Sequence, residues 1–286
     1  MSNGVFEKDL FGKSRHGLAI DRLREFCSGK KVLCAFSGGK DSQTCYHLLK
    51  EAGVEFHAEY SVTRFEPPEL IKFIKEFYPD VTFRRAYKKS LIEEIAYCGL
   101  PSMFARWCCA AKHVKTDGYD IAIIGVRWAE SSKRRGTWRM FGFKRDKTAY
   151  LCPIVEWSDA DVWEYLGNRP HCRLYDEGFA RIGCVCCPLS VKKMHSDSVR
   201  WPRTAAMLRK GGDAYIDRMR AKNFVTKRGK PCPDWRLYAN PEQEYWNRWI
   251  TTGQTCRAIG SIPVDDNQIC LFEGSGFSEL DEGDER

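Results

Sequence analysis

The chain has 286 residues, of which 43% are hydrophobic, and its formal net charge at pH 7 is +8. This size supports one domain with a large core plus an appendage, and it argues against a second full domain. No apolar run reaches the roughly 18 residues of a membrane-spanning helix, and the N-terminus lacks the apolar core of a signal peptide, so we expect a cytoplasmic protein without a membrane partner.

Strand and helix patterns alternate along the chain after a helical lead-in at residues 1–30. The expected strands are Val32–Phe36, Val54–Val62, Val81–Tyr87 and Ile121–Val126. The expected helices between them are Gln43–Lys50, Pro68–Phe77, Leu91–Tyr97 and Ala110–Thr116. This alternation predicts an α/β fold with a doubly wound parallel sheet, in which ligands bind at the carboxyl ends of the strands.

A short loop rich in small and donor residues joins the first expected strand to the first helix: Ser37, Gly38, Gly39, Lys40, Asp41 and Ser42. Adjacent glycines let backbone N–H groups approach an anion, and the following helix N-terminus adds a partial positive charge. The lysine adds a mobile charge, the serines add donors, and the aspartate either caps the helix or holds Mg²⁺. We therefore predict a pyrophosphate site here. An ordinary glycine turn with a serine cap is the alternative.

Four of the fourteen cysteines form two close pairs, Cys108 with Cys109 and Cys184 with Cys187. Four thiolates from two segments suit an iron–sulfur cluster or zinc. Neighbouring residues on a helix point about 100° apart, so both thiols of the first pair reach a wide centre more easily than a single ion. This favours a 4Fe–4S cluster, with zinc and metal-free thiols as alternatives. Cys186 is interpreted as a replacement ligand, a nearby thiol or a filler of apolar space.

The segment from Arg127 to Lys147, called the basic segment below, contains eight Lys and Arg residues against Glu130 and Asp146, with four aromatic residues among them. Such a composition attracts anions. The phosphates of a small nucleotide are the first interpretation, and nucleic acid, bound through its phosphates and stacked bases, is the second. A solvated charged face is the third.

The rest of the chain shows helical patterns without predicted catalytic or metal-binding residues. A helix capped by Ser158 and ending at Leu166 is interpreted as packing. Residues 191–272 are expected to be a basic helical region with patterns at Ala205–Arg220 and Glu242–Ile250, separated by the loop Thr226–Pro233. A helical cap over the sheet is its default role, and a lid, a partner surface or a nucleic-acid platform are the alternatives. Residues 273–286 are an acidic tail that we expect to be disordered.

The loop at residues 37–42 resembles the PP-loop of the adenine nucleotide alpha-hydrolase superfamily, whose members act at the α-phosphate of ATP or of an activated sulfate nucleotide. Between about Lys31 and Leu189, further motifs resemble the phosphoadenosine phosphosulfate (PAPS) reductase family: Arg106–Lys112, Gly125-Val126-Arg127 with Glu130-Ser131-Ser132, Asp161-Val162-Trp163, Tyr175–Phe179 and Gly183–Pro188. The resemblance implies a Rossmann-like PP-loop domain at residues 31–190 that binds ATP or PAPS, followed by a helical C-terminal extension.

The resemblance also implies roles for individual residues. The 4Fe–4S ligands would be Cys108, Cys109, Cys184 and Cys187. The nucleotide would be bound by the loop, by an anion-binding set of Arg127, Arg134 and Arg135, and by Glu130. The catalytic residues would be Lys40, Asp41 with Mg²⁺, and Arg127, which stabilise the leaving pyrophosphate.

One family feature is missing from the sequence. Reductases of this family use a cysteine in a C-terminal Glu-Cys-Gly-Leu-His setting, whereas Cys256 and Cys270 lie in other contexts. The leading hypothesis is therefore an ATP pyrophosphatase that activates DNA or tRNA for sulfur insertion (DNA phosphorothioation or tRNA thiolation), with a sulfur donor such as a cysteine desulfurase. The alternatives are a thioredoxin-dependent PAPS or adenylylsulfate reductase that releases sulfite, and a non-catalytic nucleotide-binding subunit of a modification or phage-defence complex.

Overall fold

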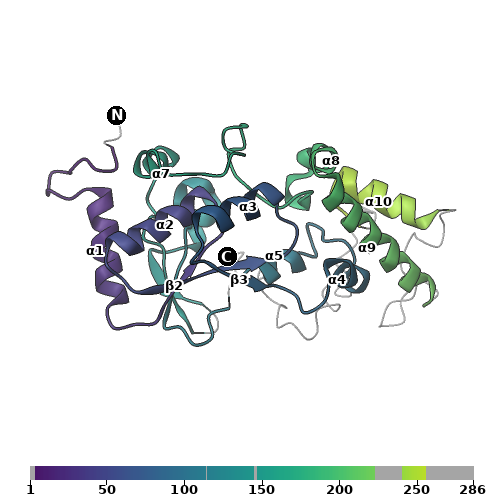
Figure 1. Cartoon of the computed structure of the whole chain (residues 1–286), viewed down its shortest axis with the longest axis horizontal. Helices are drawn as coiled ribbons and strands as arrows, with labels where there is room; N and C mark the ends of the chain where they lie inside the picture. The colour runs from purple at the N-terminus through teal and green to yellow at the C-terminus, as the bar shows by residue number, and fades with distance from the viewer. Residues whose placement is uncertain (1–3, 114, 145–146, 223–239, 256–286) are drawn as a thin grey trace. The chain divides into compact units, whose positions relative to one another are not determined.

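The computed structural model describes residues 4–113, 115–144, 147–222 and 240–255 (Figure 1). These residues form two compact units. The first comprises residues 4–61, 68–84 and 115–182, and the second comprises residues 62–67, 85–113 and the described part of the chain from residue 183 onward. Three features from the sequence analysis lie outside the described residues, namely the loop at 226–233, the late cysteines Cys256 and Cys270, and the acidic tail.

The first unit is built on a six-stranded sheet with the strand order β3-β2-β1-β4-β6-β5. The strands are β1 (Val32–Ala35), β2 (Phe56–Val62), β3 (Thr82–Arg85), β4 (Ile121–Ile123), β5 (Phe141–Phe143) and β6 (Ala149–Leu151). β1 pairs in parallel with β2 and β4, β4 pairs in parallel with β6, and β5 runs antiparallel to β6. The predicted doubly wound sheet is confirmed, and its order reverses between β1 and β4, where such sheets place their ligands.

Two strands were missed by the sequence analysis, β5 and β6. Each has only three residues, which is too short for an alternating pattern to stand out. β5 also lies inside the basic segment, where the surrounding lysines and arginines hide its two phenylalanines. The basic segment is therefore partly regular structure, with the 3-10 turn η1 (Trp128–Glu130), the short helix α6 (Ser132–Thr137) and β5 in sequence.

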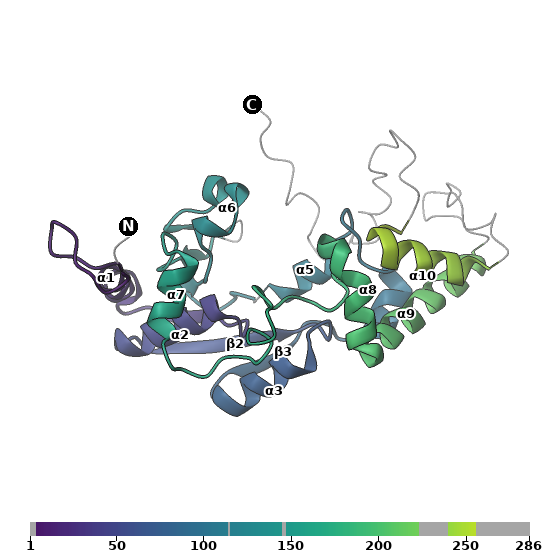
Figure 2. The same ribbon diagram turned by 90° about the horizontal axis from the view of Figure 1, so that it is seen from above.

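The longer helices of the first unit are α1 (Arg15–Cys27), α2 (Lys40–Glu51), α3 (Pro68–Phe77) and α7 (Asp159–Leu166). α2 packs between α1 and α7, so these three helices lie side by side (Figure 2). α3 has the bounds predicted for it. α2 begins at Lys40, three residues before its predicted start, and thus includes Lys40, Asp41 and Ser42 in its first turn.

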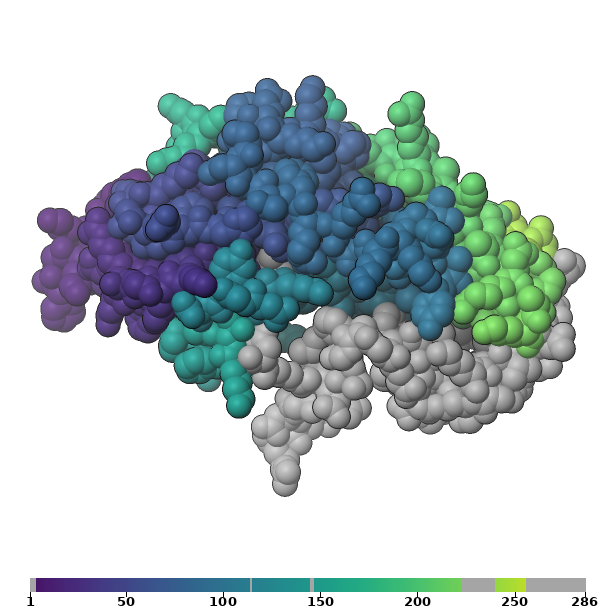
Figure 3. All heavy atoms as spheres, turned by 60° about the horizontal axis from the view of Figure 1, so that its bottom comes forward, coloured from purple at the N-terminus to yellow at the C-terminus, as the bar shows by residue number. Residues whose placement is uncertain are grey.

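The second unit is helical and consists of α4 (Leu91–Cys98), α5 (Trp107–Lys112), the 3-10 turn η2 (Pro188–Ser190), α8 (Val191–Arg200), α9 (Pro202–Arg220) and α10 (Pro241–Thr252). α4 packs along α9, and Figure 3 shows the blue atoms of α4 directly against the green atoms of α9. α5 starts at Trp107 instead of the predicted Ala110 because the buried Trp107 ring packs against Phe65 and Tyr87. Both Cys108 and Cys109 consequently lie on this helix. Across the described ranges, no helix is both long enough and apolar enough to span a membrane.

The close contact between α4 and α9 gives a test of the second unit's packing. A Cβ added at Gly211 on α9 would lie 2.7 Å from the Cβ of Ile95 on α4. We expect Gly211→Ala to lower the free energy of unfolding by about 1–2 kcal/mol, because the overpacking cost exceeds the gain in helix propensity. Lys210→Ala, at the exposed neighbouring position, is the control. Urea denaturation followed by circular dichroism measures both, and an unchanged or raised midpoint for Gly211→Ala would contradict the packing.

Candidate nucleotide site and cysteine set

The predicted phosphate loop, residues 37–42, connects β1 to α2. Its second residue, Gly38, has a conformation that favours glycine. Gly38 has φ +73°, and a Cβ there would lie 2.6 Å from the Cδ1 of Ile74 on α3. The Ser42 hydroxyl accepts a hydrogen bond from the Ser37 amide at 3.1 Å and donates to the carbonyl oxygen of Gly39 at 2.9 Å. The turn is therefore held by its own side chains, which lets the N-terminus of α2 form in a defined direction.

Lys40, the first residue of α2, is a buried cation with 2% exposure. Its amide donates to the hydroxyl oxygen of Tyr175 at 2.9 Å, and burial raises the pKa of Tyr175 to about 12, so the phenol stays protonated. The Lys40 Nζ has three oxygen neighbours, which are the carbonyl oxygen of Ala180 at 3.5 Å, Asp159 Oδ1 at 3.6 Å and Asp41 Oδ2 at 3.8 Å. All three distances exceed those of close N–H···O hydrogen bonds.

Arg127, which follows β4, is 1% exposed, and each nitrogen of its guanidinium donates a hydrogen bond within the protein. Its Nε donates to Asp41 Oδ1 at 2.6 Å, its Nη1 donates to the carbonyl oxygen of Trp157 at 3.2 Å, and its Nη2 donates to Asp159. Burial alone would lower the pKa of Arg127, but the two carboxylates outweigh it and raise that pKa. The structure thus brings together the three residues predicted to be catalytic, Lys40, Asp41 and Arg127.

Close backbone packing explains why residues after β4 reach the start of α2. A Cβ added at Gly125 would lie 2.9 Å from the carbonyl carbon and oxygen of Asp41. Only a residue without a side chain lets the two segments come this near. The contact falls at the reversal of strand order between β1 and β4.

Asp159 is a site residue that the sequence analysis missed. It is the first residue of α7, after the Ser158 cap, and its carboxylate contacts both Lys40 and Arg127. Burial would raise the pKa of Asp159, but the hydrogen bond from Arg127 and the charge of Lys40 lower it. The packing interpretation of this helix holds for its buried Val162 and Leu166, but not for its first residue. An acidic residue behind a serine cap is ordinary helix chemistry, so the sequence offered no signal.

The buried carboxylate of Glu130 accepts hydrogen bonds from one backbone amide and from two arginine side chains of the first unit. It accepts from the Arg127 amide at 3.2 Å and from Arg181 Nη2 at 2.8 Å, and it also pairs with Arg134 on α6. Arg181 was not predicted to belong to the site. Arg135, the neighbour of Arg134, instead lines a surface hollow of about 600 Å³, together with Trp128, Ala129, Ser131, Ser132 and Gly136.

The aromatic residues of the basic segment are not equivalent. Trp128 and Trp138 pack against the buried cluster of Val126, Tyr150, Cys152 and Val155, and the Trp128 Nε1 donates to the carbonyl oxygen of Trp138 at 2.8 Å. These two rings therefore serve the core of the first unit. Phe143 on β5 is 68% exposed and remains accessible for stacking.

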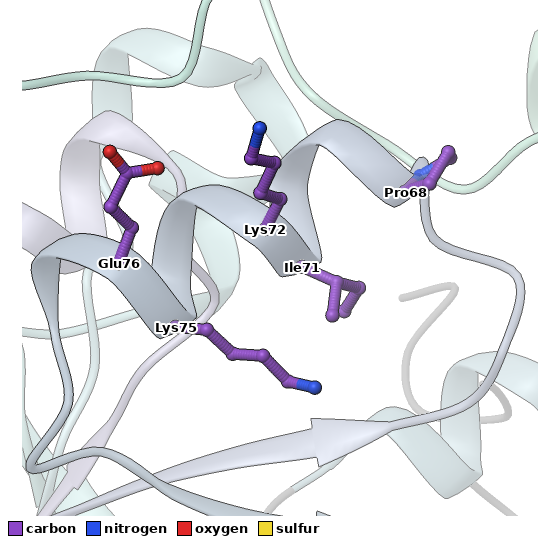
Figure 4. Close-up of a pocket in the computed structure, with 5 residues that line it drawn as sticks. All are labelled: Pro68, Ile71, Lys72, Lys75 and Glu76. Carbon is purple, nitrogen blue, oxygen red and sulfur yellow. The ribbon is translucent and has the colours of Figure 1, made fainter.

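A second surface hollow, of about 580 Å³, lies on α3 and is lined by Pro68, Ile71, Lys72, Lys75 and Glu76 (Figure 4). The side chains come from successive turns of this one helix. None of the residues predicted to bind nucleotide or metal is among them.

The four cysteines predicted to be metal ligands belong to the second unit. The hydrogen bond between the Cys108 and Cys109 thiols raises the pKa of Cys108 and lowers that of Cys109. Burial and the nearby Cys184 and Cys187 also raise the pKa of Cys108. Over the part of the chain that the structure describes, no three His, Cys, Asp or Glu side chains are placed as ligands of one metal ion.

Lys112 and Glu66 supply charges beside these cysteines. The Lys112 Nζ lies 3.5 Å from the Cys184 Sγ. Burial would lower the pKa of Lys112, but Cys184 and Glu66 outweigh it and raise that pKa. A soft four-sulfur donor set with a neighbouring ammonium fits an anionic thiolate-ligated centre.

Cys186 faces away from this set. Its backbone has φ +52°, its amide donates to Asp197 Oδ2 at 3.0 Å, and its thiol donates to the carbonyl oxygen of Met194 at 3.4 Å. The side chain is 1% exposed and lies against α8. Of the interpretations left open by the sequence, the structure supports the one in which Cys186 fills a buried space.

Comparison with known proteins places these features in a family. Residues 31–190 match the model of the phosphoadenosine phosphosulfate reductase domain. The chain is 28% identical over 206 residues to an adenosine 5'-phosphosulfate reductase of Shouchella clausii. The aligned region covers 67% of this chain and 86% of that protein. It is 30% identical over 191 residues to the enzyme of the same name from Oceanobacillus iheyensis, with 62% and 79% covered.

Two further similar proteins are covered by the alignment to very different extents. An uncharacterized protein of Methanocaldococcus jannaschii is 32% identical over 174 residues, so 56% of this chain spans only 36% of that protein. A crystal structure of PAPS reductase from Candida auris, a phosphate complex, aligns at 14% identity with a TM-score of 0.40, over 63% of this chain and 98% of that one. Because the family model covers more than half of the sequence, the chain belongs to the phosphoadenosine phosphosulfate reductase family of the PP-loop superfamily.

Proposed function

We propose that this chain is an ATP pyrophosphatase that activates an oxygen atom of a nucleic acid, in DNA or tRNA, for replacement by sulfur. The observation that carries the proposal is the grouping of Lys40, Asp41 and Arg127 at the N-terminus of α2, directly after the phosphate loop. A helix N-terminus and a buried ammonium are suited to the negative charge of a leaving pyrophosphate. The missing Glu-Cys-Gly-Leu-His setting favours ATP over an activated sulfate as the substrate.

The proposed reaction has two steps. The target oxygen attacks the α-phosphorus of ATP, the bond from that phosphorus to the bridging oxygen breaks, and pyrophosphate leaves. A sulfur nucleophile at the oxidation level of hydrosulfide, supplied by a donor such as a cysteine desulfurase with a thiol reductant, then displaces AMP from the adenylated target.

Each residue has a distinct part in the first step. Lys40 binds the phosphate oxygens that become negative, while Arg127 orients Asp41 through the 2.6 Å hydrogen bond. Asp41 would hold Mg²⁺, which, when bound, supplies further positive charge to the pyrophosphate. Because each guanidinium nitrogen of Arg127 donates to a protein acceptor, Arg127 is proposed to position Asp41 and Asp159 beside the phosphates.

The cysteine set is proposed to bind a 4Fe–4S cluster through Cys108, Cys109, Cys184 and Cys187. The support is the mutual electrostatic influence of the four thiols and the ammonium of Lys112 beside Cys184. When bound, such a cluster would supply redox-active iron and inorganic sulfide to the second unit. Zinc is the alternative occupant of the same donors.

The nucleic-acid target is supported by charge. The chain has a net charge of +8, and Arg135 lines the 600 Å³ hollow on the basic segment. Binding through phosphates releases counterions and weakens steeply with salt. The exposed ring of Phe143 offers a stacking surface for a base.

A second candidate function is a sulfonucleotide reductase, and one specific observation favours it. Two of the relatives carry the name adenosine 5'-phosphosulfate reductase, and this chain spans 86% and 79% of their lengths. In that reaction a cysteine thiolate, here Cys256 or Cys270, attacks the sulfur of the nucleotide and releases AMP. The thiols of thioredoxin then reduce the S-sulfocysteine, release sulfite and become a disulfide.

The two functions differ in their products. We expect anaerobically purified protein to release pyrophosphate from ATP and no sulfite from PAPS or adenylylsulfate with thioredoxin present. A pyrophosphate assay coupled to a chromogenic phosphatase and a sulfite assay measure the two outcomes. Sulfite release that disappears in Cys256→Ser or Cys270→Ser would establish the reductase and refute the pyrophosphatase.

Lys40 gives a test of the phosphate loop. We expect Lys40→Met to lower kcat/KM for pyrophosphate release by about 100-fold or more, because one electrostatic contact to the leaving group is lost. Lys50→Met, which changes a half-exposed lysine at the other end of α2, is the matched control and should retain activity. Equal rates for the two variants would count against the role of Lys40.

The ligand assignment is tested with three cysteine variants. We expect Cys184→Ala and Cys187→Ala to lose bound iron and inorganic sulfide, together with brown absorbance, because each removes a thiolate ligand. Cys186→Ala should keep them, since its thiol lies against the Met194 carbonyl oxygen. Iron, sulfide and zinc are measured after anaerobic purification. Full iron content in Cys184→Ala and Cys187→Ala, or loss confined to Cys186→Ala, would overturn the assignment.

A further inference from the structure

We propose that Asp159 is a specificity-determining residue of the phosphate loop, because its carboxylate competes with the incoming phosphate for Lys40 and so selects an anion that arrives with a divalent cation. The inference rests on the proposed function, since it concerns the same loop. It adds a residue that lies outside the loop and at the start of a different element, α7.

The charged side chains of the loop and of Asp159 balance one another. Two cations, Lys40 and Arg127, and two carboxylates, Asp41 and Asp159, form one connected group of ion pairs. Their formal charges cancel, so these side chains give the loop no net attraction for a polyphosphate. The positive potential that remains comes from the N-terminus of α2, and it is only a partial charge.

The two carboxylates differ in their exposure to solvent. The side chain of Asp41 is 19% exposed, while that of Asp159 is 65% exposed. The Asp159 Oδ1 lies 3.6 Å from the Lys40 Nζ, close enough for strong attraction but longer than a close hydrogen bond. A phosphate oxygen can therefore replace Asp159 at the Lys40 ammonium while Asp159 keeps its hydrogen bond from Arg127.

The consequence is discrimination between anions. A bare polyphosphate must compete with Asp159 and is repelled by its charge. A polyphosphate that carries Mg²⁺ brings positive charge that compensates both carboxylates. The loop is thereby tuned toward magnesium-bound ATP or pyrophosphate and against an anion that binds without metal.

Binding of inorganic pyrophosphate, measured by isothermal titration calorimetry with EDTA or with Mg²⁺, tests this inference. Asp159→Asn keeps the shape and the acceptor for Arg127 but removes the charge, so we expect metal-free pyrophosphate to bind about tenfold more tightly. The strengthening of binding by Mg²⁺ should become smaller in this variant. A gain of affinity cannot result from partial unfolding, which can only weaken binding.

Three controls complete the experiment. Asp159→Glu should behave like the unaltered chain, and Asp21→Asn, at an exposed position on α1, makes the same charge change elsewhere. Unchanged or weaker metal-free binding in Asp159→Asn would overturn the inference, as would equal tightening in Asp21→Asn. Lys40→Met separates the two proposals. If this variant binds pyrophosphate with unchanged affinity, the proposed function is refuted. If Lys40→Met weakens binding but Asp159→Asn has no effect, only this inference is refuted.

Discussion

The proposed nucleotide site is held together by the buried guanidinium of Arg127. Removing one partner of a buried ion pair costs about 3–5 kcal/mol, so a cation with 1% exposure requires matched acceptors. Arg127 finds them in Asp41 at the start of α2, in Asp159 at the start of α7 and in the carbonyl oxygen of Trp157. One side chain thus fixes the end of β4 against the starts of two helices, and Lys40 lies between the same two carboxylates.

The cysteine set depends on helix packing instead of charge. The segment between α4 and α5 is held by α10, where the Tyr245 hydroxyl accepts from the Leu100 amide at 2.7 Å and the Trp249 Nε1 donates to the carbonyl oxygen of Pro101 at 2.6 Å. Trp107 is the first residue of α5, and its Nε1 donates to the carbonyl oxygen of Gly99 at 3.2 Å. The helices that follow the second cysteine pair therefore also position the first pair, which gives the C-terminal helical region a structural role in the proposed cluster site.

Sequence reasoning succeeded where the determinants are local. The phosphate loop lies between a strand and a helix as predicted, and α3 has its predicted bounds, because apolar periodicity and glycine act over a few residues. It failed where the partner is distant in sequence. Arg134 and Arg135 are neighbours of the same type, yet Arg134 pairs with Glu130 whereas Arg135 lines a surface hollow. No residue adjacent to Arg181 in the sequence indicates that Arg181 also pairs with Glu130.

The sequence alone was enough to predict a turn suited to phosphate after the first strand, and four thiols in two pairs. Both follow from residue type and short spacing, which do not require the rest of the fold. The folded chain was needed to show that Asp159 faces Lys40, that Cys186 lies against α8, and that Trp128 and Trp138 pack against a buried cluster. The physical reason is that the pairing of a buried charge and the direction of a side chain depend on segments that packing brings together, and no local pattern encodes which segments those are.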